Sequence, residues 1–79
     1  MRVLFFAALR EAAGTREVVA DAPDLTSLLV DLLATLPREF ARALPGCTAV
    51  VDGRRVKLSE HVDLTGAQEV ALLPPFAGG

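Results

Sequence analysis

The first nine positions of the chain are almost continuously apolar. In residues 2–9 (Arg-Val-Leu-Phe-Phe-Ala-Ala-Leu), hydrophobic side chains occupy both alternating sets of positions. A strand has this pattern when both of its faces are covered, or when its second face is a docking surface. We expect a turn at 12–15 and a second strand at 16–20, so that the two strands form a hairpin.

A stripe of leucines marks the one clear helix that the pattern predicts. Asp24 precedes the stripe, where its carboxylate can accept the free N–H groups of a first helical turn, and Pro37 ends it. At 100° per residue the leucines fall within an arc of roughly 140°, which predicts a stripe that faces the core along its full width. The stripe consists of Leu25, Leu28, Leu29, Leu32, Leu33 and Leu36.

The remaining pattern adds three strands after the helix. Asp52-Gly53 is typical of a tight hairpin turn. The order β-β-α-β-β-β predicts an α+β roll, with one main helix across one face of a sheet of about five strands. We expect a short helical turn at 38–44, strands at 48–51, 54–58 and 69–73, and a loop at 59–68.

Composition limits the class of protein. A chain of 79 residues with 52% hydrophobic residues is expected to form one small folded domain. No apolar run approaches the ~20 residues of a membrane span, and the N-terminus lacks the features of a signal peptide, so we expect a cytoplasmic protein that does not bind a membrane. The single cysteine agrees with a reducing compartment. Scattered charges with a net value of −2 argue against nucleic acid as a partner.

Side chains that carry out chemistry are few. His61 is the only histidine and has no neighbour with which to form a metal site, so we expect it in a solvated loop. Cys47 has no paired base and is expected to be a partly buried structural residue. Ser27 and Ser59 lack the motif of a catalytic serine, and the separated glycines form no phosphate loop. These observations predict no bound metal or cofactor, and a protein that is not an enzyme by itself.

The C-terminal segment carries the strongest functional signal. Two prolines favour an extended path after the last strand, and two terminal glycines leave the final carboxyl group unobstructed. Six residues at ~3.3 Å each reach about 20 Å, enough to enter the active site of another protein. We therefore expect a domain over 1–73 and a flexible arm over 74–79 that delivers the α-carboxylate of Gly79. The arm consists of Pro74, Pro75, Phe76, Ala77, Gly78 and Gly79.

Three segments carry specific motifs: residues 3–7 (Val-Leu-Phe-Phe-Ala), 10–14 (Arg-Glu-Ala-Ala-Gly) and 69–79 (Glu-Val-Ala-Leu-Leu-Pro-Pro-Phe-Ala-Gly-Gly). In these motifs, and nearly from end to end in its pattern, the chain resembles the small subunit of molybdopterin synthase, the MoaD-type sulfur carriers, within the ubiquitin-like β-grasp proteins. It departs from the family pattern at 65–69, where Thr-Gly-Ala-Gln-Glu replaces a more acidic turn, and at Phe76, where a smaller aliphatic residue is frequent.

The resemblance implies a function in molybdenum cofactor biosynthesis. A ubiquitin-activating-like adenylyltransferase would use ATP to adenylate Gly79, and a sulfur source would convert the adenylate to a thiocarboxylate. The arm from Pro74 to Gly79 would then enter the large catalytic subunit of the synthase, where sulfur passes to cyclic pyranopterin monophosphate. The working assembly would be a heterotetramer.

Two further questions follow from the residues. Phe6 and Leu73, on neighbouring strands, either form an exposed patch that docks the partners or fill the core.

Alternative functions share the same terminal chemistry: a sulfur carrier for thiamin thiazole synthesis, or a protein modifier conjugated to lysines through Gly79. Pro74-Pro75 counts against the thiamin alternative. A plain interaction module with an incidental Gly-Gly end fits the whole segment least well.

Overall fold

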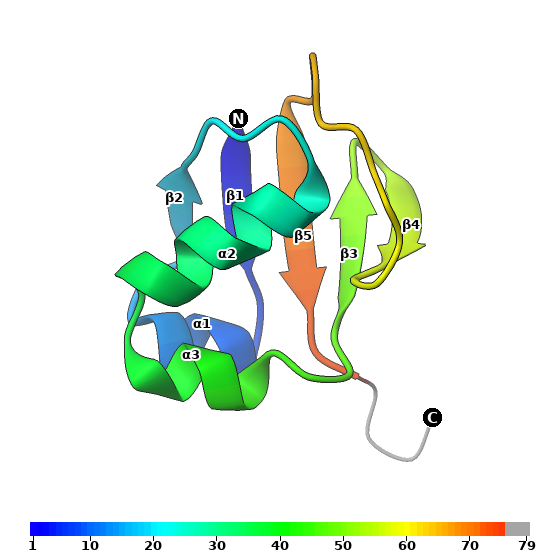
Figure 1. The fold of residues 1–79 in the computed structure, drawn as a ribbon. Helices are drawn as coiled ribbons and strands as arrows, with labels where there is room; N and C mark the ends of the chain where they lie inside the picture. Colours follow the sequence, from blue (N-terminus) through cyan, green and yellow to red (C-terminus); the bar gives the residue numbers. More distant parts are fainter. Residues whose placement is uncertain (76–79) are drawn as a thin grey trace.

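Five strands of residues 1–75 form one mixed sheet (Figure 1). A computed structural model describes these residues, and residues 76–79 lie outside the described part. The sheet has the order β2-β1-β5-β3-β4, in which β1 and β5 are parallel and the other neighbours antiparallel. The strands are β1 (Arg2–Phe5), β2 (Glu17–Val19), β3 (Thr48–Val51), β4 (Arg54–Lys57) and β5 (Glu69–Leu73).

Three helices cover one face of this sheet. The main helix, α2 (Leu25–Thr35), crosses in front of the strands in Figure 1. Two short helices, α1 (Ala8–Ala13) and α3 (Arg38–Ala43), contact each other near the end of the sheet where β1 and β5 finish. No helix among residues 1–75 is long and apolar enough to cross a membrane. The predicted α+β roll with one main helix is therefore confirmed, and α3 lies at the predicted short helical turn, whereas α1 was not predicted.

Helix α1 replaces the second half of the first predicted strand. The strand ends at Phe5, because Ala7 has a φ of 51° that no extended strand contains. Leu9 and Ala13 are both buried, and their spacing of four residues places them on one helical face. Gly14, with a φ of 76°, caps the helix and donates its N–H to the carbonyl of Arg10. The apolar character of residues 7–9 thus belongs to a turn and a helix.

Helix α2 begins at its predicted cap. Asp24 accepts a hydrogen bond from the N–H of Ser27 at 2.8 Å. Leu25, Leu28 and Leu32 are buried, whereas the side chain of Leu33 is 44% exposed. The prediction that the whole leucine stripe faces the core is therefore wrong at Leu33. This residue lies at the edge of the stripe, beside a groove next to α3, and the sheet covers only the centre of the stripe.

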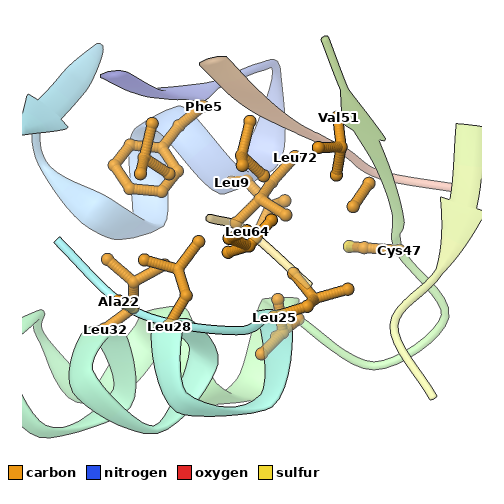
Figure 2. Packing of buried hydrophobic residues seen from close by; sticks show 14 of the residues in the cluster. Phe5, Leu9, Ala22, Leu25, Leu28, Leu32, Cys47, Val51, Leu64 and Leu72 are labelled. Carbon is orange, nitrogen blue, oxygen red and sulfur yellow. The ribbon is translucent and has the colours of Figure 1, made fainter. Parts of the chain in front are cut away.

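The core lies between the sheet and the helices (Figure 2). Figure 2 shows Phe5 and Leu72 from the sheet pointing toward Leu28 and Leu32 of α2. Phe5 also contacts Phe40 of α3 edge to face, with ring centroids 5.5 Å apart. This aromatic pair links β1 to α3. Its edge-to-face arrangement adds to the stabilisation that burial of the two rings provides.

The predicted Asp-Gly turn links β3 and β4 and also holds β5. Asp52 and Gly53 have φ values of 45° and 87°, as expected for a two-residue hairpin turn of type I′. The carboxylate of Asp52 accepts hydrogen bonds from the backbone N–H groups of Gln68 and Glu69, at 3.1 and 2.9 Å from Oδ1. The hairpin is therefore fixed to the start of β5, the strand that leads to the C-terminal segment.

Candidate functional site

The C-terminal segment leaves from a central strand of the sheet. Strand β5 is paired on both sides: Leu72 is opposite Phe5 of β1 and Ala49 of β3, and Leu73 is opposite Thr48. Two neighbours hold its backbone in place, so the direction in which the chain leaves the domain is set by the sheet. Of the predicted arm, Phe76, Ala77, Gly78 and Gly79 lie outside the described residues.

Two prolines form the described base of this arm. Pro74 is half-buried and Pro75 is exposed. Neither proline has a backbone N–H group to donate. The hydrogen bonds that β5 makes with its neighbouring strands therefore cannot continue in full beyond Leu73. Pro75 lies against the loop between α3 and β3: a Cβ atom placed on Gly46 would be 3.7 Å from Cγ of Pro75. The described base of the arm therefore lies beside this loop as well as after β5.

The face of the sheet opposite the helices carries an apolar strip. Leu4, Ala71 and Val50 are consecutive neighbours across β1, β5 and β3. Phe6 directly follows the last residue of β1, and Leu73 ends β5 at the same edge of the sheet. We call these five residues the outer strip.

Phe6 and Leu73 are both at least partly accessible in this strip. Phe6 is 43% exposed, and Leu73 is half-buried. The alternative that both residues simply fill the core is therefore wrong. Phe6 lies just after the strand on which it was predicted, and together with Leu4 it lines a shallow hollow of about 230 Å³.

Basic side chains flank the outer strip on both sides. Arg55 of β4 is opposite Val50, and Lys57 is opposite Thr48. Across the sheet, Arg10 and Arg16 line the hollow beside Phe6, together with Glu17. Around the apolar centre, Arg10, Arg16, Arg55 and Lys57 thus outnumber Glu17, so the surface is complementary to a partner with apolar residues and mainly carboxylates around them.

The other candidate side chains lie elsewhere. Cys47 is buried, its thiol donates a hydrogen bond to the carbonyl of Ala43 at 3.2 Å, and burial raises the pKa of the thiol. These features disfavour the reactive thiolate. His61 is exposed in a loop, as predicted. In residues 1–75, no group of three or more potential metal ligands comes together.

Two carboxylates near His61 cap backbone groups. Hydrogen bonds from Ser27 and Thr65 lower the pKa values of Asp24 and Asp63, respectively. Each bond is 2.8 Å long and comes from a backbone N–H group. Because such bonds favour the charged form, these aspartates serve the fold as capping groups.

One feature near the arm was missed by the sequence analysis. A groove of about 650 Å³ lies between α2, α3 and the adjoining ends of β3 and β4. We call it the α2–α3 groove. The sequence signal for it was the position of Leu33 at the edge of the leucine stripe, although the whole stripe was predicted to face the core. Its lining includes Leu29, Leu33, Leu44, Gly46, Cys47 and Lys57.

Comparison with known proteins decides the family. The sequence model of the ThiS family matches residues 3–79. The chain belongs to the ThiS family. One curated relative of this ThiS-family protein is the "Molybdopterin synthase sulfur carrier subunit" of Escherichia coli (strain K12). The two sequences are 37% identical over 81 residues, and the match covers 100% of this chain and 99% of the relative. The protein with the same name from Chlamydomonas reinhardtii is 29% identical, with 100% and 98% covered.

Solved structures share the fold. The crystal structure of SAMP1 from Haloferax volcanii matches with a TM-score of 0.69 and a sequence identity of 27%. The match covers 99% of this chain and 97% of the SAMP1 chain. The solution structure of the small archaeal modifier protein 1 from Methanosarcina acetivorans has a TM-score of 0.75 at 23% identity, with 99% and 94% covered. The ubiquitin-like β-grasp fold implied by the resemblance is confirmed.

Proposed function

We propose that this ThiS-family protein is the sulfur carrier of molybdopterin synthase and acts through the α-carboxylate of Gly79. The observation that carries the proposal is full-length similarity to relatives named for that role, 37% identical over the entire chain for the Escherichia coli protein. The matched length includes both the domain and the Gly-Gly residues. A small domain that presents Gly79 on an arm from a central strand suits a carrier.

The proposed chemistry takes place in three steps on the terminal carboxyl group. A carboxylate oxygen of Gly79 attacks the α-phosphorus of ATP, and pyrophosphate leaves. A sulfur donor then replaces AMP, which leaves a thiocarboxylate. In the synthase, the thiocarboxylate sulfur attacks a carbon of the pyranopterin substrate and displaces an oxygen leaving group, which joins substrate and Gly79 through a thioester. Water then cleaves the acyl C–S bond, so the sulfur stays on the substrate and Gly79 regains its carboxylate. The catalytic groups for these steps belong to the activating enzyme and to the large subunit.

Within residues 1–75 the carrier offers no competing sulfur nucleophile in a reactive setting. The thiol of Cys47 is buried and its pKa is raised. The proposal therefore places the transferred sulfur on Gly79, and makes Cys47 a structural residue. In this proposal the protein is a sulfur-donating subunit, and its partners supply the catalysis.

We further propose that the outer strip docks the large subunit while Pro74 to Gly79 enter its active site. Phe6 and Leu73 lie at the edge of the sheet from which the arm leaves, so one contact surface can hold the domain and aim the arm. The basic borders of the strip favour a partner with acidic residues at its rim. Two large and two small subunits form the expected heterotetramer.

Reconstitution tests this function. The carrier is charged by an activating enzyme with ATP and a sulfur donor, and is then mixed with a large synthase subunit and the pyranopterin precursor. The full chain should give product, and a chain that lacks Gly79 should give none. Product formation by the shortened chain would refute the proposal. A carrier for thiamin thiazole synthesis would be charged in the same way but would give no product with the large subunit.

A second function has independent support from the solved structures. SAMP1 of Haloferax volcanii shares the fold at 27% identity, and the relative from Methanosarcina acetivorans is named a modifier protein. A modifier would use the same adenylate but would pass the acyl group of Gly79 to a lysine amine. Conjugates of this chain with other proteins in its host, found by mass spectrometry of lysine-linked Gly-Gly remnants, would favour this function over the sulfur carrier.

A further inference from the structure

The turn that follows Phe6 holds a residue in a conformation that its side chain disfavours. Ala7 has a φ of 51° and a ψ of −125°, and the carbonyl of Phe6 accepts a hydrogen bond from the N–H of Leu9 at 3.1 Å. This geometry matches a type II′ turn with Ala7 at its first central position, where φ and ψ are about 60° and −120° and glycine is the usual residue. Alanine at this position therefore carries backbone strain.

The local structure does not account for this alanine. Ala7 is exposed, so its methyl group does not fill the core. It is the N-cap of α1, yet its side chain makes no capping hydrogen bond. Asp52 is the only other non-glycine residue with a positive φ among residues 1–75. It lies in a hairpin turn where aspartate is common, and its carboxylate is bonded to β5, whereas Ala7 has no comparable compensation.

The strained residue connects Phe6 to a fixed framework. Before Phe6, the N–H of Phe5 donates a hydrogen bond to the carbonyl of Arg16 at 2.9 Å. After Phe6, Leu9 is fully buried and donates its N–H to the carbonyl of Phe6. Phe6 lies between these two anchors and is 43% exposed. The torsions of Ala7 therefore determine how Phe6 is oriented relative to α1 and the core.

We propose that Ala7 is a positioning residue that holds Phe6 in its docking orientation, an inference that rests on the docking role of the outer strip proposed above. At positive φ, glycine has wide allowed regions, whereas a residue with a Cβ has only narrow ones. The reversal from β1 into α1 requires the positive φ, so the methyl group of Ala7 limits the remaining torsional freedom beside Phe6. A ring that is already oriented loses less conformational entropy when a partner covers it. The strain at Ala7 thus lowers the stability of the domain and raises its affinity for the large subunit.

Replacement of Ala7 by glycine and by D-alanine separates strain from positioning. D-alanine prefers the mirror images of the usual regions, which include the observed torsions, so Ala7→D-Ala removes the strain and keeps the torsions narrow. The chains can be joined from two segments at Gly46-Cys47, with residue 7 in the synthetic one. Both variants should be more stable to denaturant than the native chain, but only Ala7→Gly should lower the ¹⁵N order parameter of the Phe6 amide. Equal order parameters in the three chains, or no gain in stability, would overturn the proposal.

Binding to the large synthase subunit provides the functional measurement. Ala7→Gly should bind several-fold more weakly than the native chain although it is the more stable protein, and Ala7→D-Ala should bind as the native chain does. In reconstituted synthase, the KM for the charged carrier should rise in Ala7→Gly while kcat stays unchanged, because the chemistry at Gly79 is not altered. Native-like binding by Ala7→Gly would overturn the proposal. Equal weakening in both variants would also overturn it, since it would indicate a lost contact of the methyl group.

A second pair of variants tests whether Ala7 acts through Phe6. In a Phe6→Ala background, Ala7→Gly should cause no further loss of affinity, because no ring is left to orient. The same several-fold loss with and without the ring would contradict the positioning role. Failure of the native chain to bind would overturn the docking function and this inference with it, whereas equal binding by the native and Ala7→Gly chains would overturn only the role of Ala7.

Discussion

Gly46 lies beside Pro75 at the base of the C-terminal segment. A Cβ on Gly46 would be 3.7 Å from Cγ of Pro75, an ordinary van der Waals distance, so the site has room for a side chain. The glycine is required instead by its φ of 82°, which residues with a Cβ rarely adopt. The left-handed conformation turns the chain from α3 into β3 and brings this loop against the base of the arm. The base of the C-terminal segment, Pro74 and Pro75, therefore lies between the end of β5 and this loop.

The turn after β1 contains a residue that glycine would suit better. Ala7 has φ 51° and ψ −125°, a combination costly for any residue with a Cβ. We expect Ala7→Gly to raise the free energy of unfolding by about 1 kcal/mol, measured by urea denaturation. Ala12→Gly, inside α1, is the control and should lower it by about 1 kcal/mol. A loss of stability in Ala7→Gly would contradict the account of this turn.

Substitution of Phe6 tests docking separately from folding. Its side chain is 43% exposed, so Phe6→Asp should leave the protein folded, as judged by circular dichroism and the denaturation midpoint. Binding to the large synthase subunit, measured by calorimetry, should weaken by about 2 kcal/mol or more, because a charge replaces an apolar contact at the centre of an interface.

Val19→Asp is the matched control for that experiment. Val19 is 82% exposed and is opposite Arg2, at the end of the sheet away from the arm. Its substitution should leave the affinity unchanged. If Phe6→Asp bound as well as the native chain, or if Val19→Asp weakened binding equally, the outer strip would not be the docking surface.

Acid should weaken the fold through Asp24 and Asp63. Hydrogen bonds from Ser27 and Thr65 lower the pKa values of these carboxyl groups below the usual 3.8. A carboxyl group with a depressed folded-state pKa stabilises the fold above its unfolded-state pKa, and this contribution disappears as the pH falls through the folded-state value. We expect the free energy of unfolding to fall between about pH 5 and pH 2.

The double variant Asp24→Asn and Asp63→Asn tests the origin of this loss. Asparagine keeps an oxygen that accepts the N–H groups of Ser27 and Thr65, but it does not titrate. The variant should therefore show a shallower decrease in stability over the same pH range. An unchanged slope would assign the acid sensitivity to other groups.

Cys47 should be dispensable for sulfur transfer. Cys47 is 6% exposed, its thiol donates a hydrogen bond to the carbonyl of Ala43, and burial raises the pKa of the thiol. We expect slow reaction with a thiol-specific reagent in the native protein and rapid reaction after unfolding. Cys47→Ala should still acquire sulfur at Gly79 when charged by the activating enzyme. A folded Cys47→Ala chain that acquires none would place a sulfur-bearing step on this cysteine.

Local signals were sufficient for the parts of the fold that depend on local chemistry. The Asp24 cap and the Asp52-Gly53 turn were predicted from residue types, and both have the expected geometry. The strands after the helix were also predicted to within a residue of their observed limits. In these segments, the intrinsic preference of the residues agrees with the tertiary structure.

Elements that depend on tertiary contacts were less predictable. Residues 7–9 have the apolar composition of a strand, yet the strained turn at Ala7 and the burial of Leu9 against other elements make them part of a turn and α1. The exposure of Leu33 likewise depends on where α3 lies, which periodicity cannot specify. For the candidate site, the arm at 74–79 stays a prediction from the sequence, whereas the accessibility of Phe6 and the α2–α3 groove required the assembled fold.

The mass of the C-terminal peptide from protein purified out of its native host tests the central claim most directly. The account predicts a population in which sulfur replaces one oxygen of the terminal carboxyl group, localised by fragmentation to Gly79 and still present in Cys47→Ala. Sulfur found on Cys47 with an unmodified Gly79, in cells that are making molybdopterin, would contradict it.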